Sequence, residues 1–372
     1  MTKAFRWVAV AAIVLAPATV LGTMAHADVA NNASATNVQQ GDNKSSTNQN
    51  GTSKSGDAVA GQVTGVVSSG RTSVDATNKS DNVDISTGDA RGANSSAAFV
   101  GLNSSTATAV GGAADILNNA PVTNLQEGDN RYELNQTLTA TSGDGVGGQV
   151  IGVVTSGGGS ASVVAANTST NIDISTGDAR AFNDAAAFVG LNSSSATGVA
   201  ADVLNTASAT NVQEGDNKLN AGQTATSKSG DGVGGQVLGI VSAGAASVDA
   251  TNSSDHNDIS TGDARTGNDF ASFVGLNQAS ATGIAAADIL SGGAASNVQE
   301  GSNSKNLTQD ASATSGDSVA GEVAGVVTSA GGSADLVLAN TSTNSSTDTG
   351  DGRFFNTDSS FTGLNVSPGI SI

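Results

Sequence analysis

The sequence predicts an all-β fold, an elongated array of repeats stacked in the manner of a β-solenoid. A long sequence period, a strand-like alternation of small apolar and polar residues, and a shortage of bulky side chains lead to this prediction. Aromatic residues make up only 3% of the 372 residues, too few for each repeat to build a core of its own. Such a unit buries its apolar face by stacking on its neighbours, as the coils of a solenoid do.

The sequence period comes from a motif, Asn-Val-Gln-Gln-Gly-Asp-Asn, that occupies residues 37–43. Close copies begin at Asn124, Asn211 and Asn297, so the steps are 87, 87 and 86 residues. A following Gln, a Gly-Asp-x-Arg element and a Phe-x-Gly-Leu-Asn element keep the same order in every unit. The fourth unit is truncated and divergent, as expected of a cap. We therefore divide the chain after its first 27 residues into a short segment, 28–33, and four repeats, 34–120, 121–207, 208–293 and 294–372.

Strands are predicted by alternation with a period of two residues. Between residues 58 and 67, Val59, Val63 and Val67 share one face, and β-branched residues at this period are typical of a strand. Gly-Asp pairs and stretches rich in Gly and Ser supply the turns. Identical Asn and Gln residues stacked from repeat to repeat would form amide ladders at the strand spacing of about 4.8 Å.

The spacing of the turns keeps an alternative fold open. The Gly-Asp pairs of the first repeat end at Asp42, Asp57 and Asp89, and the next pair ends at Asp129. The resulting steps of 15, 32 and 40 residues define no uniform coil. A string of four β-sandwich-like modules joined by β-contacts would tolerate such uneven spacing.

Residues 1–27 have the features of a signal peptide. Two basic residues precede an apolar run from Trp7 to Val20, and the small-x-small pattern Ala-His-Ala ends at Ala27. The run is short for a permanent membrane anchor. We expect a bacterial protein that is secreted or held at the cell surface, with no stable membrane insertion once the signal is removed.

The charge of the chain excludes one class of partner. Removal of the two basic residues of the signal leaves 12 basic and 33 acidic side chains, a formal net charge of −21. Such a surface repels nucleic acid. The remaining candidate partners are cell-surface or matrix components, glycans, and other copies of the chain. Because the chain has no cysteine, no disulfide supports the fold.

Pairs of aspartates are the candidate metal ligands. They flank a Gly turn in each repeat, and oxygen-rich sites of this kind suit calcium. The competing interpretation is that Gly-Asp only shapes the turn, and that Arg91, on the same strand face as Asp89, satisfies the carboxylate without metal. No other cofactor is predicted. The candidate calcium positions are Asp84, Asp89, Asp173, Asp178, Asp258, Asp263, Asp348 and Asp351.

No catalytic residue is predicted. His256 is the sole histidine after residue 27, and it replaces Asn82 and Asn171 of the earlier repeats in what resembles a solvated loop. Paired carboxylates cleave polysaccharides in glycosidases, but each Asp pair here recurs with the repeat, whereas an active site occurs once. Tyr132, His256 and Glu322 are the local departures from the repeat pattern.

A short part of each repeat resembles a known family. Gln126-x-Gly-x-Asn130 followed by Gln136 is similar to the Gln-x-Gly-x-x-Asn-x5-Gln signature of curlin, the subunit of bacterial curli fibres, but is one residue shorter in its first half. The likeness covers about 14 residues of each 87, and it implies a fibre only by analogy. The whole pattern also resembles uncharacterised secreted repeat proteins of high-GC bacteria.

The repetition of every polar constellation leads to an expected function. We expect an exported, acidic, non-enzymatic repeat protein with a structural or adhesive role at the cell surface or in the extracellular matrix. The alternatives are a secreted polysaccharide-active enzyme of β-helical fold, a calcium-dependent module, and a fibre-forming surface module similar to curli.

Overall fold

The computed structural model describes residues 30–110, 117–156, 161–200, 204–285, 290–328, 333–367 and 369–371. The predicted signal peptide, residues 1–27, lies outside the described residues. Within the described ranges all regular elements are β-strands, and no helix suited to crossing a membrane is found there. The all-β prediction is therefore confirmed.

The strands follow one another in four similar circuits, which we call rungs 1 to 4. Rung 1 contains β1 (Ala30–Asn32), β2 (Ala35–Gln39), β3 (Asn43–Lys54), β4 (Ala58–Ser69), β5 (Thr72–Ser86) and β6 (Ala90–Val110). Rung 2 contains β7 (Leu117–Gln126), β8 (Asn130–Thr141), β9 (Gly145–Ser156), β10 (Ala161–Ser175) and β11 (Ala179–Ala200). Rung 3 contains β12 (Leu204–Gln213), β13 (Asn217–Lys228), β14 (Gly232–Ser242), β15 (Ala246–Ser260) and β16 (Ala264–Ala285). Rung 4 contains β17 (Leu290–Gln299), β18 (Asn303–Thr314), β19 (Ser318–Thr328), β20 (Ala334–Thr343), β21 (Ser346–Asp348), β22 (Gly352–Val366) and β23 (Gly369–Ser371).

Consecutive rungs pair through parallel, in-register strands that form five sheets. Residues one sequence period apart lie opposite each other, so that Asn37 pairs with Asn124, Asn124 with Asn211, and Asn211 with Asn297. This arrangement is a β-solenoid in which a whole repeat forms one coil. The alternative of four separate sandwich-like modules is wrong, because strands of all four repeats share every sheet.

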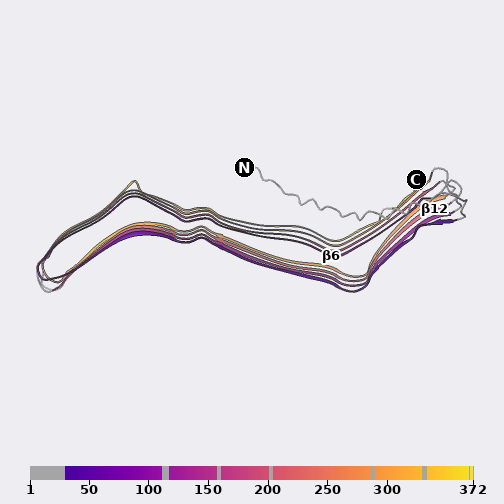
Figure 1. Ribbon diagram of the computed structural model, residues 1–372, viewed down its shortest axis with the longest axis horizontal. Coiled ribbons are helices and arrows are strands. Elements are labelled where there is room, and N and C mark those ends of the chain that lie inside the picture. The colour runs from indigo at the N-terminus through magenta and orange to yellow at the C-terminus, as the bar shows by residue number, and fades with distance from the viewer. Residues whose placement is uncertain are drawn as a thin grey trace.

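Each rung is a long, flattened loop with two legs (Figure 1). In rung 1 the outgoing leg contains β1 to β4, and the return leg contains β5 and β6, with the reversal at the end of the molecule far from the C terminus. The two legs pack face to face, β4 on β5 and β3 on β6. The uneven turn spacing now has a cause: two Gly-Asp pairs interrupt the outgoing leg and the third interrupts the return leg.

The core lies between the two legs and consists mainly of small and medium-sized side chains. Ile151 and Val153 on β9 share a buried cluster with Val163 and Ala165 on β10. A second cluster, which includes Tyr132 on β8, joins β8 and β13 to β6, β11 and β16. Because the layer between the legs is thin, Ala, Gly and Val fill most of it, which explains the low aromatic content of the sequence.

Two rows of residues with positive φ change the direction of the return leg. In β5 the core-facing side chains have even numbers up to Ser80 and odd numbers from Val83 onward. The switch occurs at Asn82, where φ is 54°, a left-handed conformation that Asn and His tolerate better than most residues. The equivalent residues of the later rungs are Asn171, His256 and Asn344, with φ of 53°, 53° and 51°. Gly101, Gly190, Gly275 and Gly363 form the second row, on β6 and its equivalents.

Candidate functional site

The aspartates of the Gly-Asp-x-Arg elements are bound within the stack. The backbone N–H of Asp178 donates to Oδ1 of Asp89 at 2.9 Å, and the same contact links rung 3 to rung 2 and rung 4 to rung 3. The second carboxylate oxygen accepts from the Arg two residues later, as between Arg180 and Asp178 at 2.6 Å. The predicted ion pair between Arg91 and Asp89 is confirmed. The backbone donor from Asp351, followed by the side chain of Arg265, holds the pKa of Asp263 below its usual range.

The other candidate aspartates form a separate row on the return leg. Asp173 lies beside Asp84 in one neighbouring rung and beside Asp258 in the other. Burial raises the pKa of Asp173 above its ordinary value, and the charges of Asp258 and Asp84 add to the shift. Asp348 is not in this row: Ser346 pairs with Asp258, and Asp348 pairs with Ser260. The register of rung 4 does not change here, since Thr343 pairs with Asp255 and Ser346 with Asp258. Rung 4 has Ser346 at the position that holds Asp in the other rungs, so Asp348 is not the equivalent of Asp258.

These rows do not converge on a metal site in the part of the chain that the structure describes. No group of three or more His, Cys, Asp or Glu side chains is close enough there to hold a metal ion. The Gly-Asp carboxylates already accept hydrogen bonds from a backbone N–H and from an Arg guanidinium. These contacts support the competing interpretation, in which the aspartates shape the turn. Calcium binding stays a prediction.

The three local departures from the repeat occupy different places. His256 is exposed at the left-handed position of β15, and its Nδ1 lies 3.0 Å from Oδ2 of Asp255. Tyr132 is fully buried, and its hydroxyl lies 3.1 Å from the hydroxyl of Ser96. Glu322 lines an internal cavity together with a row of Gln residues. Only Glu322 therefore belongs to a hollow that a small molecule could enter.

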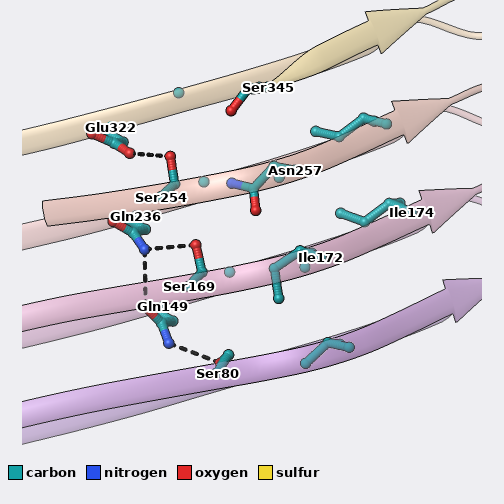
Figure 2. A pocket seen from close by; sticks show the side chains of 18 of the residues that line it. Ser80, Gln149, Ser169, Ile172, Ile174, Gln236, Ser254, Asn257, Glu322 and Ser345 are labelled. Atoms are coloured by element: carbon teal, nitrogen blue, oxygen red, sulfur yellow. Dashed lines mark hydrogen bonds between the residues drawn. The ribbon is translucent and has the colours of Figure 1, made fainter. Parts of the chain in front are cut away.

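The cavity has a volume of about 490 Å³ and runs along the stacking direction between the two legs. It exists because Gly and Ala occupy the outgoing leg at Ala60, Gly61, Gly147 and Gly148, and because the return leg changes direction at the Asn82 row. One part of the cavity is polar and carries Gln and Ser side chains, and the part farther along the strands carries Ile172 and Ile174 (Figure 2). Ile85 and Ile259 also line the cavity.

The polar side of the cavity carries a row of Gln side chains, and in rung 4 an acid replaces the Gln. Gln236 donates through Nε2 to Oε1 of Gln149 at 3.1 Å and to Oγ of Ser169 at 2.9 Å (Figure 2). Gln149 donates in turn to Ser80. Glu322 holds the next position, where it accepts from Ser254. Since an ionised carboxylate has no proton to give, Oε1 of Gln236 is buried without a partner.

The cavity is lined mainly by amide, hydroxyl and apolar side chains. Among the described residues that line it, Glu322 is the one acid, and none is a histidine, lysine or arginine. Glycoside hydrolysis requires two carboxyl groups on either side of the bond. The free carbonyl oxygens of Gln236 and Asn257 suit the water that polar cavities of this size hold.

No family model, curated protein or solved structure matches this chain. The site must therefore be interpreted from its own geometry.

The outer surface carries an apolar feature that the sequence alone did not place. Valines of β4, β9, β14 and β19 stand in three parallel rows on the solvent side of one sheet; even in the interior rungs Val150 and Val237 are 38% and 43% exposed. We call this set the valine surface, and it consists of Val59, Val63, Val67, Val146, Val150, Val154, Val233, Val237, Val241, Val319, Val323 and Val327. On the other leg, Phe99, Phe188, Phe273 and Phe361 stack with ring centroids 4.9 to 5.2 Å apart.

Alternation with a period of two shows that these valines share a face, but it does not show which face is outside. The opposite face of β4 carries Ala58, Ala60, Gln62, Thr64 and Val66, residues small or polar enough to fit the thin layer between the legs. In the interior rungs the core-facing positions of the same sheet hold Ile151, Val153, Leu238 and Ile240, so side-chain size does not distinguish the two faces either.

Proposed function

We propose that this chain is an exported, acidic repeat protein with a structural and adhesive role at the bacterial cell surface or in the extracellular matrix, and that it is not an enzyme. One observation carries the proposal: the recurring Asn, Gln and Asp side chains are used to bind each rung to the next. Asn130 to Asn217, Gln223 to Gln136 and Asp178 to Asp89 are three such rows. Because these side chains hold the stack together, we expect the protein to act through its large repeated surface and not through one local site.

The valine surface supports the adhesive part of the proposal. Contiguous exposed apolar patches are uncommon on soluble monomers, and they commonly mark interaction sites. Here the patch is flat, because it lies on one parallel sheet, and it spans all four rungs. A flat apolar surface on a strongly acidic protein favours apolar contact with matrix components over recognition of a small ligand.

Immunogold labelling of producing cells, before and after a wash with high salt and mild detergent, tests the location. Replacement of Val63, Val150 and Val237 by Thr keeps the β-branch and removes the apolar row. We expect this variant to leave the cell fraction several times more readily than the parent chain. The matched control replaces the exposed row Ser73, Ser162 and Ser247 on the return leg by Thr, and its retention should not change.

The competing enzyme class is tested on a broad panel of polysaccharides. New reducing ends or unsaturated uronides produced by the purified chain would overturn the non-enzymatic proposal. Label found only in the cytoplasm would overturn the proposed location, and equal retention of the valine variant and its control would remove the valine surface from the account.

A further inference from the structure

The first and last rungs leave two open ends of the stack. Rung 1 pairs only with rung 2, and rung 4 pairs only with rung 3 among the described strands. Each end therefore presents one unpaired edge of all five sheets, including the long strands β6 and β22. Long parallel edges are templates for the pairing of another chain unless something blocks them.

The amide ladders give the two ends opposite hydrogen-bonding character. In the Asn row, Nδ2 of Asn43 donates to Asn130 at 2.8 Å, and the donation continues through Asn217 to Asn303 at 2.8 and 2.7 Å. Every donor in this row points toward rung 4. The row therefore ends with an Asn donor at rung 4 and an Asn acceptor at rung 1.

The Gln row has the reverse direction. Nε2 of Gln309 donates to Gln223 at 2.8 Å, Gln223 donates to Gln136 at 2.8 Å, and Gln136 donates to Gln49 at 2.7 Å. This row ends with an acceptor at rung 4 and a donor at rung 1. The rung 1 end of one copy is thus complementary to the rung 4 end of another in the direction that the ladders already have within the chain.

The hydrogen bonds at the turns also have one constant direction along the stack. The backbone N–H of each Asp at a Gly-Asp turn donates to the carboxylate one rung closer to the N terminus, as Asp144 does to Asp57 at 3.0 Å and Asp317 does to Asp231 at 3.0 Å. Rung 4 therefore offers the carboxylates of Asp317 and Asp351, and rung 1 offers the matching N–H groups of Asp57 and Asp89.

The core-facing side chains of rung 4 also suit those of rung 1. In rung 4, Lys305 on β18 forms an ion pair with Asp358 on β22. In rung 1, Ser45 occupies the position equivalent to Lys305, and Ser96 occupies the position equivalent to Asp358. If the register within the chain continues from copy to copy, the hydroxyl side chains of Ser45 and Ser96 would cover this ion pair.

We propose that rung 1 of one copy stacks on rung 4 of a second copy, so that the solenoid continues from molecule to molecule as an open, head-to-tail filament. The interface repeats the contact that already occurs three times within the chain. A heterologous contact of this kind does not close on itself. The proposal does not depend on where the protein is located or on the valine surface.

Glycines at the turns provide a test that separates the stack from the fold. A Cβ at Gly143 would lie 2.1 Å from the carbonyl oxygen of Gly56. A Cβ at Gly230 would lie 1.9 Å from the carbonyl oxygen of Gly143, and a Cβ at Gly316 would lie 1.9 Å from that of Gly230. At Gly56 no described atom lies within 4 Å of such a Cβ, because rung 1 is the first of the described rungs, and at Gly88 the nearest atom is Cβ of Ser55 at 3.8 Å. Alanine at these two positions leaves the monomer intact and collides with an added copy.

The experiment compares the chain that begins at Asp28 with its Gly56→Ala/Gly88→Ala variant, by sedimentation velocity over a concentration series and by electron microscopy. Gly65→Ala is the matched control, since neither Gly65 nor its equivalents Gly152, Gly239 and Gly325 have any atom within 4 Å of a Cβ. We expect the parent chain and the control to form filaments of constant width. The double variant should need about tenfold or more protein to assemble, because the added Cβ atoms displace backbone from every junction.

Circular dichroism and thermal melting check that the double variant is folded. A mixing experiment adds a second test, because the variant keeps an intact rung 4 end: a small fraction of it should bind to the rung 1 end of filaments of the parent chain and shorten them. A parent chain that stays monomeric at all concentrations overturns the proposal. A folded double variant that assembles as well as the parent, or that leaves filament length unchanged on mixing, also overturns it.

Discussion

The interior rungs and the end rungs share one backbone but choose different side chains for it. At one core-facing position of the outgoing leg, rungs 2 and 3 have Tyr132 and Leu219, both fully buried. The end rungs have Ser45 and Lys305 in the same row. On the facing return leg, rung 3 has the buried Phe270 and the end rungs have Ser96 and Asp358.

The difference shows what selects a residue in this fold. An interior side chain is covered by a rung on each side as well as by the opposite leg, so it can be large and apolar. In a single molecule an end side chain has one open side, where an apolar group would lose part of its burial and polar groups can reach water. In the proposed filament this side would instead face the polar side chains of the next copy. Position along the stack therefore decides between a core residue and a polar one, although the local strand is the same.

Glycine makes the largest predicted difference between interior and end. Gly230→Ala in rung 3 places a Cβ 1.9 Å from the carbonyl oxygen of Gly143, so the backbone of two rungs must move apart. We expect a loss of about 3 kcal/mol or more in the free energy of unfolding. Gly56→Ala in rung 1 should change it by less than about 0.5 kcal/mol. Thermal and denaturant unfolding of the two variants measures this, and similar losses in both would contradict the account of the turns.

The Gln row of the cavity gives a comparison of intermediate size. Glu322→Gln in rung 4 would give Oε1 of Gln236, which has no partner, a donor of the kind that Gln149 already receives. We expect a gain of about 1 kcal/mol in the free energy of unfolding. The control Glu300→Gln removes an exposed acid of the same rung and accounts for the change in charge. An equal gain in both variants would show that charge, and not the amide ladder, is responsible.

Much of this arrangement could be predicted from the sequence because the period and the pairing register are the same quantity. The spacing of Asn37, Asn124, Asn211 and Asn297 predicts which residues stack, and the structure stacks them. The Arg91 to Asp89 pair was also predictable, because Asp89 directly precedes β6 and residues two apart in extended backbone lie on one side.

The features that could not be predicted depend on contacts between the legs. The sequence does not show where the rung reverses, so the uneven turn spacing appeared to oppose a solenoid. It does not show that the valines of β4 face solvent, because both faces of that strand contain apolar residues. The cavity near Gln236 depends on the direction change at the Asn82 row, which has no signature in composition or period. The misplaced Asp348 is different, because the pairing offset between the last two rungs is constant and makes Ser346 the equivalent of Asp258.

The smallest predicted effect concerns the aspartate row of the return leg, where interior and end differ in the number of charged neighbours. Asp173 has a carboxylate on each side, from Asp84 and Asp258, whereas Asp84 has one on a single side. Because burial and these charges raise the pKa of Asp173, the folded state binds the proton more tightly than the unfolded chain does. Stability therefore falls as the pH rises through that pKa, and the ionised row is a cost at neutral pH.

Asp173→Asn should remove this cost and add up to about 0.5 kcal/mol at pH 7, since the carboxylate is only partly desolvated and the side chain is largely exposed to solvent. The gain should shrink as the pH falls and vanish below about 4, where the carboxyl is protonated in both states. Asp84→Asn should give a smaller gain. Asp263→Asn should act in the opposite direction, because its pKa is lowered and its ionised form stabilises the fold at neutral pH. Melting curves of the three variants between pH 3 and pH 8 measure these differences, and a gain for Asp173→Asn that persists at pH 3 would show that charge repulsion along the row is not its cause.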